Sequence, residues 1–310
     1  MIEKKEIPMT DATTDVICPF LIDSGLSRGQ AVRLNATLDT IISQHDYPEP
    51  VGVLVAQAGV LTALLASTIK YDGVFTLQIQ GNGAVSVLAV DLTTDGQMRG
   101  YARFNADAVE KAAADAEKGQ IAAFFGEGTL AFNVETKDQS YQGVIALNQP
   151  TLSDCVLEYF KQSEQIETAL KIAVATPSQS GKGWTGAAIM LQRMPMDRQI
   201  ARELKEDEIE DLWNTSVVLL HSATPAELLD SSLPLEKLLY RLYHLNDLHF
   251  FMQKTIKFGC RCSQEKVIEM LRRFPKQDRS EMAVDGKIKV DCQFCGKSYV
   301  LDLKDLDAEE

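Results

Sequence analysis

Alternating apolar and polar positions predict a series of β-strands in the first part of the chain. Residues 73–80 alternate in this way, end at Gly81-Asn82-Gly83, and are followed by an apolar run at 84–90, which predicts a β-hairpin. Further strands are predicted over residues 98–104, 129–134 and 141–147. Helices are predicted over residues 28–45, 51–69 and 153–174. This mixture predicts an α+β domain over residues 1–199, with mostly antiparallel sheets and packed helices.

The run from Val51 to Ile69 contains 19 residues without a charge, which is long enough to span a bilayer. It also contains Gln57 and two glycines, and no basic cluster flanks it to set an orientation. A helix buried inside a globular core has the same composition. We therefore predict a core helix and no membrane partner.

From about Ala201 the pattern changes to short amphipathic helices, which predicts a helical linker over residues 200–256. An acidic run that begins at Glu203 is typical of a solvated helix face. Thr224-Pro225-Ala226-Glu227 has the form of a helix-capping box. Two apolar stripes follow the helical period: Ile209, Leu212, Trp213, Ser216, Val217 and Leu220, then Leu235, Leu238, Leu239, Leu242 and Leu245. If released from a packing surface, these stripes would be exposed.

Composition limits the classes of partner. The 310 residues carry a formal net charge of −13, which argues against binding to nucleic acid or anionic lipid through the overall field. Residues 1–16 show no apolar segment after their lysines, so no secretory signal is predicted. A reducing, cytoplasmic location is the resulting expectation.

The cysteines carry the most specific chemical signal. Four of the six lie in the last 51 residues, as Cys260-Arg261-Cys262-Ser263 and, after 29 intervening residues, Cys292-Gln293-Phe294-Cys295-Gly296. Four thiolates in two close pairs predict one tetrahedral Zn²⁺ site held by Cys260, Cys262, Cys292 and Cys295. Cys18 and Cys155 stand alone in apolar surroundings and are predicted to act as small buried hydrophobes.

A zinc-binding module is predicted over residues 257–310. Ser263 begins a helix with Val267, Met270, Leu271 and Phe274 on one face, Pro275 ends it, and Asp285-Gly286 turns into a strand at 288–292. So small a core predicts that folding depends on the metal, which contributes about 10–16 kcal/mol in comparable modules.

The spacing alone leaves two kinds of zinc site open. An inert structural site is the commoner kind. The single residue between Cys260 and Cys262 is a spacing at which a disulfide would be strained and labile, which favours a redox-sensing site.

Two other functional classes use similar motifs. Residues 251–310 carry twelve Lys or Arg and eleven Asp or Glu without a basic stripe, which is atypical of a nucleic-acid-binding zinc ribbon. A thiol-disulfide oxidoreductase would place Cys292-x-x-Cys295 at the start of a helix after a strand, whereas this motif is predicted in a hairpin.

Weaker catalytic patterns are interpreted as turns. Gly25-Leu26-Ser27-Arg28-Gly29 matches the nucleophile-elbow pattern, but its serine lies near the amino terminus behind only Phe20-Leu21-Ile22. Residues 126–131 match a dinucleotide fingerprint, but they precede a predicted strand where a cofactor-binding helix should begin. His45, His221, His244 and His249 show no metal-ligand spacing on a shared helix face and are predicted to be solvated or in the core.

Six internal segments precede the thiol motifs in a characteristic order. They are Arg33-Leu34-Asn35, His45-Asp46-Tyr47-Pro48, Lys70-Tyr71-Asp72-Gly73-Val74-Phe75-Thr76-Leu77-Gln78, Met98-Arg99-Gly100-Tyr101-Ala102-Arg103-Phe104, Tyr159-Phe160-Lys161-Gln162-Ser163-Glu164-Gln165 and Met190-Leu191-Gln192-Arg193-Met194-Pro195. Together with the Cys-x-Cys-Ser and Cys-x-x-Cys ends, they make nearly the whole chain resemble the bacterial redox-regulated heat-shock holdases, the thirty-three-kilodalton chaperonin family. Gln57, in place of an acidic residue, and Gly186-Ala187-Ala188, in place of a more glycine-rich stretch, depart from the family but do not touch the thiols.

The resemblance implies a chaperone without enzymatic activity that binds unfolding client proteins independently of ATP. It implies an inactive, reduced, zinc-loaded form and an active, oxidised form, a dimer built on the first domain. In the oxidised form Cys260 would bond Cys262 and Cys292 would bond Cys295, zinc would leave, and the tail and linker would lose structure. That this unfolding exposes the leucine stripes as a client surface is a hypothesis.

Overall fold

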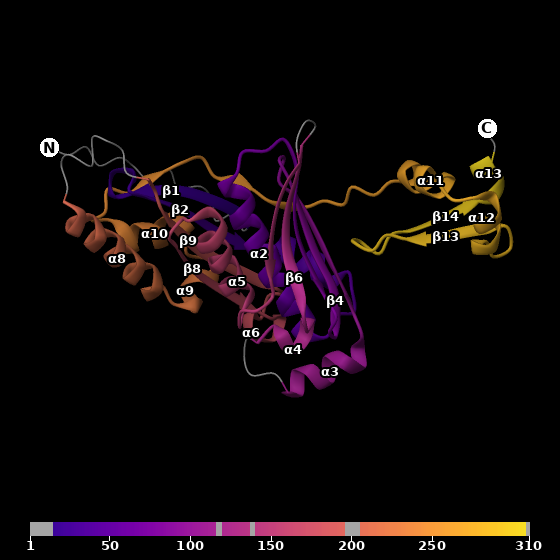
Figure 1. The fold of residues 1–310 in the computed structure, drawn as a ribbon, viewed down its shortest axis with the longest axis horizontal. Coiled ribbons are helices and arrows are strands. Elements are labelled where there is room, and N and C mark those ends of the chain that lie inside the picture. The colour runs from indigo at the N-terminus through magenta and orange to yellow at the C-terminus, as the bar shows by residue number, and fades with distance from the viewer. Residues whose placement is uncertain (1–14, 116–119, 137–139, 196–204, 308–310) are drawn as a thin grey trace. The chain divides into compact units, whose positions relative to one another are not determined.

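The computed structural model describes residues 15–115, 120–136, 140–195 and 205–307. The chain divides into two compact units, Met1–Phe258 and Gly259–Glu310. Figure 1 shows the elements of each unit. The predicted boundary between residues 199 and 200 lies outside the described residues, so the division into a core, a linker and a metal-binding module stays a prediction.

The first unit contains two six-stranded sheets. Sheet A has the order β10-β1-β2-β9-β8, with β11 also pairing with β1, and sheet B has the order β12-β5-β4-β3-β6-β7. Every pairing in sheets A and B is antiparallel except that of β12 with β5. The strands of sheet A are β1 (Val16–Ile22), β2 (Ser27–Leu34), β8 (Thr168–Ala175), β9 (Thr185–Arg193), β10 (His249–Phe250) and β11 (Lys254–Thr255). Those of sheet B are β3 (Gly73–Gly81), β4 (Val85–Thr93), β5 (Gln97–Phe104), β6 (Gly128–Thr136), β7 (Ser140–Ala146) and β12 (Lys257–Phe258). The predicted α+β class and the hairpin of β3 and β4 are confirmed.

Helix α2 (Glu49–Thr68) is the core helix that the uncharged run predicts. It packs against strands of both sheets, and Val51, Leu61 and Leu64 on it are at most 1% exposed. Among the described residues it alone is long and apolar enough to cross a membrane, and 78% of its most apolar window is buried inside the fold. The burial accounts for the absence of charge, since each face of α2 meets protein.

Shorter helices complete this part of the unit. They are α1 (Ala36–Ser43), α3 (Ala106–Asp115), α4 (Ala122–Phe125), α5 (Leu152–Tyr159) and α6 (Pro177–Ser180), with a 3₁₀ turn η1 (Asp23–Gly25) and a π-helical turn η2 (Phe160–Glu164). Thr151 caps α5 by accepting a hydrogen bond from the backbone N–H of Asp154.

Two helix predictions are wrong in part. Residues 28–34 belong to strand β2, so only Ala36–Ser43 of the predicted helix at 28–45 is helical. Residues 168–174 belong to strand β8, so the predicted helix at 153–174 ends with the π-helical turn. Both strands lie in a sheet that is covered on two faces, and such strands lose the period-2 alternation that identifies a half-exposed strand.

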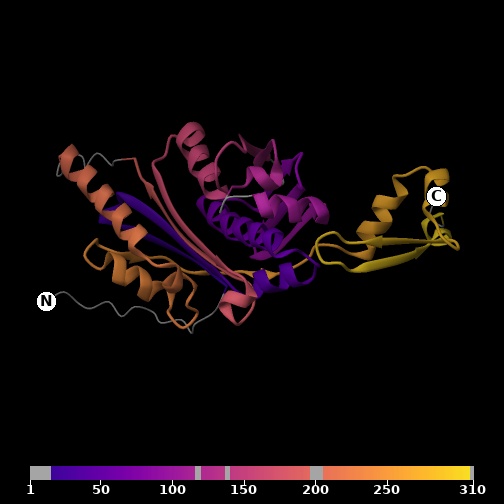
Figure 2. The same ribbon diagram turned by 90° about the horizontal axis from the view of Figure 1, so that it is seen from below.

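Three helices cover the face of sheet A opposite α2. They are α8 (Glu206–Ser222), α9 (Pro225–Leu229) and α10 (Leu235–Tyr243), and Figures 1 and 2 show them along one side of the sheet. Trp213, Leu220 and Leu238 on these helices share a buried cluster with Phe20 and Ile189 of the sheet. The linker stripes are therefore packed in this form of the chain.

The predicted details of this segment are largely confirmed. The Thr224 capping box forms, and Leu235, Leu238, Leu239 and Leu242 are buried. Leu245 is not part of the buried stripe, because it follows the end of α10 and is 85% exposed. The segment is also not helical to its end, since residues 249–258 contain the short strands β10, β11 and β12. Glu203 lies outside the described residues.

Arg33 on strand β2 and Asp23 in the turn η1 between β1 and β2 hold these helices. Arg33 on β2 donates from Nε to the carbonyl oxygen of Leu228 at 2.7 Å, from Nη1 to that of Leu233 at 2.6 Å, and from Nη2 to that of Glu227 at 3.2 Å. Asp23 accepts hydrogen bonds from Ser216 Oγ on α8 and from Asn246 Nδ2 after α10. These bonds supplement the apolar packing of the helices on sheet A.

The second unit is a small α/β module. Its elements are α11 (Gln264–Arg272), α12 (Lys276–Met282), β13 (Lys287–Asp291), β14 (Ser298–Asp302) and α13 (Leu303–Asp307). As predicted, Ser263 caps α11, accepting from the backbone N–H of Lys266, and Asp285 and Gly286 form the turn before β13 with φ of 51° and 73°. Its buried core consists of Leu271, Ile288, Leu301 and Leu306. Met270 and Phe274 remain 42% and 38% exposed, so only part of the predicted helix face is covered.

Candidate metal centre

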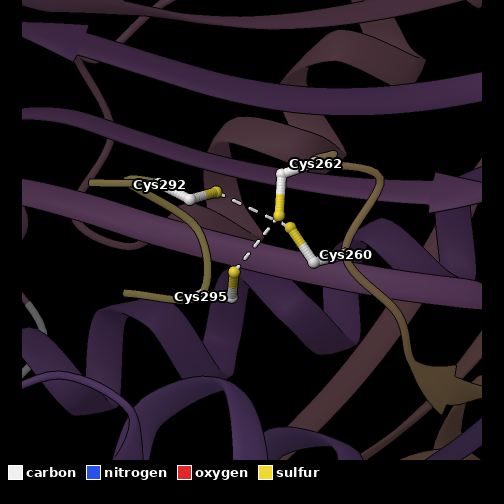
Figure 3. A group of neighbouring side chains, drawn as sticks. All are labelled: Cys260, Cys262, Cys292 and Cys295. Carbon is white, nitrogen blue, oxygen red and sulfur yellow. Dashed lines mark hydrogen bonds between the residues drawn. The ribbon is translucent and has the colours of Figure 1, made fainter. Parts of the chain in front are cut away.

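The four clustered cysteines come from two loops of the second unit, as Figure 3 shows. Cys260 and Cys262 lie just before α11, where the Ser263 cap fixes the start of the helix. Cys292 follows β13, and Cys295 lies in the turn that leads to β14. The structure brings all four residues that the spacing singles out to one place.

The sulfur atoms are spaced as the ligands of a single ion would be. The four Sγ atoms all lie within 4.8 Å of one another. Cys260 Sγ lies 3.7 Å from Cys292 Sγ, and Cys262 Sγ lies 3.5 Å from Cys295 Sγ. A tetrahedron with metal–sulfur bonds of about 2.3 Å separates its sulfurs by about 3.8 Å. The donor set therefore fits a tetrahedral metal.

The Cys292–Cys295 turn points backbone amides toward sulfur. Gly296 donates its N–H to the carbonyl oxygen of Cys292 at 2.8 Å, and its φ of 66° is readily adopted by glycine. The N–H groups of Phe294 and Cys295 bond to the Cys292 sulfur, and that of Lys297 bonds to the Cys295 sulfur. Such amides stabilise negative charge on the two sulfurs.

Burial opposes that charge. It raises the pKa of the Cys292 thiol above its usual range and raises the pKa of Cys295 to about 12. Without a cation, these thiols are therefore neutral at pH 7. A bound metal would replace their protons, so occupancy of such a site depends on pH.

Tyr299 supports the site from β14. Its hydroxyl donates to Cys262 Sγ at 3.1 Å, and its ring lies 5.0 Å from Lys297 Nζ. Tyr299 is buried, on the face of the hairpin that holds the Leu301 side chain. Motif spacing does not reveal this residue; the apolar alternation of β14 places it on the inner face but does not identify its partner.

Sulfur donors alone favour zinc or another thiophilic ion over hard cations such as Mg²⁺ or Ca²⁺. Among the described residues, these cysteines form the one group of three or more His, Cys, Asp or Glu side chains placed to hold a metal ion. The four cysteines therefore could hold a metal, and their chemistry fits Zn²⁺.

The other candidates fall elsewhere. Cys18 and Cys155 are free and fully buried, as predicted, and burial raises the pKa of both thiols. Ser27 is buried within β2, and Gly126 lies in a turn with φ of 64°, so neither catalytic pattern forms its site. His221, His244 and His249 are exposed, and His45 stacks on Tyr47.

Comparisons with known proteins agree over nearly the full length. The family model described as "Hsp33 protein" matches residues 15–302. The chain is 33% identical over 303 residues to a 33 kDa chaperonin of Caulobacter vibrioides, covering 95% of this chain and 97% of that protein. It is 33% identical over 303 residues to a 33 kDa chaperonin of Pseudomonas fluorescens, covering 96% and 94%.

A solved structure also shares the fold. The crystal structure of a 33 kDa chaperonin from Thermotoga maritima superposes with a TM-score of 0.75 at 20% identity, covering 96% of this chain and 97% of that one. At this level of identity the similarity concerns the architecture of the chain.

Proposed function

This chain belongs to the Hsp33 family of chaperones, and from that premise we propose that it is a redox-regulated, ATP-independent holdase. In the reduced form it would hold one Zn²⁺ through Cys260, Cys262, Cys292 and Cys295 and would be inactive. Oxidation would produce the form that binds unfolding proteins and prevents their aggregation. The observation that carries the proposal is the cluster of four sulfurs within 4.8 Å of one another.

The chemistry of the switch belongs to the thiols. Formation of the Cys260–Cys262 and Cys292–Cys295 disulfides removes two electrons from each pair of thiolates. For each pair, one molecule of hydrogen peroxide accepts these electrons together with two protons from solvent and is reduced to two molecules of water. A disulfide sulfur is no longer a thiolate donor, so oxidation removes the ligands of the site. When bound, zinc supplies folding free energy to the module.

The small core of the second unit supports this coupling. Four buried apolar residues, Leu271, Ile288, Leu301 and Leu306, make up its core cluster. We propose that residues 257–310 act as the switch and residues 200–256 as a linker that opens after it, while residues 1–199 form the stable core. Opening of the linker would expose the stripe that includes Trp213, Leu238 and Leu239, which is buried against sheet A here.

The proposed partners follow from that surface. Unfolded client proteins would bind the exposed apolar stripes, and the oxidised form would be a homodimer built on the first domain. The net charge of −13 disfavours nucleic acid and anionic membranes. Thiols that must be reduced at rest are consistent with a cytoplasmic location and with a role in oxidative stress, without enzymatic turnover.

A structural zinc module is the second candidate, and one observation favours it. Cys260 Sγ contacts Cys292 Sγ at 3.7 Å and Cys262 Sγ contacts Cys295 Sγ at 3.5 Å, so sulfurs of different pairs lie next to each other, as in a simple metal cage. A thiol-disulfide oxidoreductase is less well supported, because Cys292-x-x-Cys295 lies in the turn of the β13–β14 hairpin and not at the start of a helix.

Zinc content and suppression of aggregation, measured on the same sample before and after peroxide, test the proposal. We expect one zinc per reduced chain, loss of zinc on oxidation, and protection of a denatured model protein only afterwards. The matched controls are Cys18→Ser and Cys155→Ser, which should respond as the native chain does, and Cys262→Ser, which should lose the switch. Equal protection by the reduced, metal-loaded chain would refute redox regulation.

A further inference from the structure

A cavity of about 240 Å³ opens in the first unit at the C-terminal end of α2. Its walls come from both sheets, with Phe75 and Phe132 on the paired strands β3 and β6 and Arg28 on β2. The apolar lining consists of Leu65, Ile69, Phe75, Phe132, Phe160 and Ile166. The cavity uses none of the four clustered cysteines, so it stands apart from the proposed redox function.

Two tyrosines and one carboxylate form a polar group on the wall. The hydroxyls of Tyr141 and Tyr159 lie 2.8 Å and 2.6 Å from Glu164 Oε1 and also contact each other. The π-helical turn Phe160–Glu164 brings Glu164 back to Tyr159, five positions earlier. Gly143 makes room for this arrangement, because a Cβ there would lie 2.7 Å from the Tyr159 ring.

Arg28 is the cationic group of the cavity. Its Nε donates to Oε1 of the buried Gln192 at 2.9 Å, which fixes the guanidinium and leaves both Nη groups outside that bond. Burial lowers the pKa of Arg28, and no carboxylate among the described residues forms an ion pair with it. The other charged lining residue, Glu164, is engaged by the two tyrosines.

These features select an anionic ligand. The Arg28 guanidinium is half-buried and has no carboxylate partner in the part of the chain that the structure describes, so its desolvation cost is offset only when an anion pairs with it. The phenyl rings and aliphatic side chains that line the cavity beside Arg28 favour a ligand whose remaining atoms are apolar. The volume lies below the range of about 300–1,000 Å³ typical of drug-sized ligands, so the ligand must be small.

We propose that this cavity binds a small monocarboxylic acid with an apolar body, a short fatty acid or a single-ring aryl acid, with its carboxylate on the Arg28 guanidinium. The Gln192 amide orients that guanidinium, and the phenyl rings of Phe75 and Phe132 contact the apolar body.

Calorimetric titration of the reduced full-length chain with octanoate, and separately with octan-1-ol, tests the proposal. Octanoate should bind with one site per chain, and octanol, which lacks the charge, should bind about tenfold more weakly. The Arg28→Gln variant should lose about tenfold in octanoate affinity and keep its octanol affinity. The control is Arg103→Gln, which removes one positive charge from an exposed position on β5 outside the cavity.

A second variant keeps the test independent of the folding of Arg28→Gln. Ile69 is 38% exposed at the edge of the cavity, so Ile69→Phe should fill part of it and abolish binding of both probes. Undetectable octanoate binding by the native chain, equal affinity for octanoate and octanol, or equal loss in Arg28→Gln and Arg103→Gln would each overturn the proposal.

Discussion

Tyr299 contacts the metal centre from outside the cysteine set, through the hydroxyl that donates to Cys262 Sγ at 3.1 Å. Hydrogen bonds to a ligand atom hold it in place and tune its basicity. We expect Tyr299→Phe to reduce zinc affinity by about tenfold. Competition with a chromophoric chelator measures this change directly.

Tyr240→Phe is the matched control for that variant. Tyr240 is 51% exposed on α10 and belongs to the other unit, so its loss should leave zinc affinity unchanged. Equal zinc affinity in Tyr299→Phe and the native chain would show that the Tyr299 hydroxyl does not support the site.

Cys18 is expected to resist alkylation in the folded chain. Burial, reinforced by the charge of Glu236, raises the pKa of its thiol to about 12 from an ordinary value of 9.0. Iodoacetamide at pH 9 should therefore modify Cys18 only after denaturant is added, as mass spectrometry of its peptide would show. Modification of the native chain at the rate of the unfolded one would contradict its burial.

The raised pKa of Cys18 also means that the folded state loses stability as the pH rises. The folded state holds the Cys18 proton more tightly than the unfolded state. The resulting stabilisation is fully present below about pH 9 and is lost as the pH rises to about 12. Cys18→Ala should reduce this alkaline loss in urea unfolding experiments.

Among single residues, the sequence identifies the four clustered cysteines. It does not identify Tyr299, which supports the metal centre, or Arg33, which holds the linker helices. Thiols in two close pairs are rare enough for their spacing alone to indicate a common ion. Tyr299 and Arg33 act through hydrogen bonds to partners that folding brings near, and Arg33 bonds carbonyls about 195 positions away. No local pattern encodes such distant partners.

Elements were predictable where one face of a strand meets solvent. Strand β3 alternates because its Phe75, Leu77 and Ile79 side chains face the core while the residues between them do not. Strand β2 lies between α2 on one side and the linker helices on the other, so Gln30 and Arg33 are buried along with Val32. Burial on both faces removed the alternation, and the segment then resembled a helix.

Arg33 connects that strand to the linker, and its replacement should weaken the docking of α9 and α10. In Arg33→Met, the carbonyl oxygens of Glu227, Leu228 and Leu233 lose a charged donor. We expect the free energy of unfolding to fall by about 3 kcal/mol, measured by urea titration. Hydrogen exchange in residues 225–243 should become faster in the folded state.

Arg193→Met provides the comparison. Arg193 pairs with Glu167 and Glu210, whose side chains are 58% and 52% exposed. Arg193→Met should therefore lower the free energy of unfolding by less than about 1 kcal/mol. If Arg33→Met cost no more than Arg193→Met, the bonds of Arg33 would not hold the linker.

For the whole molecule, removal of the metal should affect one unit selectively. The second unit has four residues in its core cluster, whereas α2 and both sheets share a far larger one. Because structural zinc contributes about 10–16 kcal/mol to comparable modules, a chelator should abolish protection from hydrogen exchange in residues 264–302. The amides of α2 should keep their protection.

Readdition of zinc under reducing conditions is the control, and it should restore protection in residues 264–302. Persistent protection of that region in the metal-free chain would mean that its apolar core is sufficient for folding. The proposed switch would then lack its source of free energy.

The sulfur contacts between the two pairs make incorrect disulfides possible during oxidation. Cys260 and Cys292 lie 32 positions apart, and Cys262 and Cys295 lie 33 apart. Covalent closure of loops that long would stabilise the fold by about 4 kcal/mol, roughly twice the value for a three- or four-residue loop. Mispaired isomers would thus favour the folded second unit even after zinc has left. Rapid oxidation is expected to divide the population between activated and dead-end molecules.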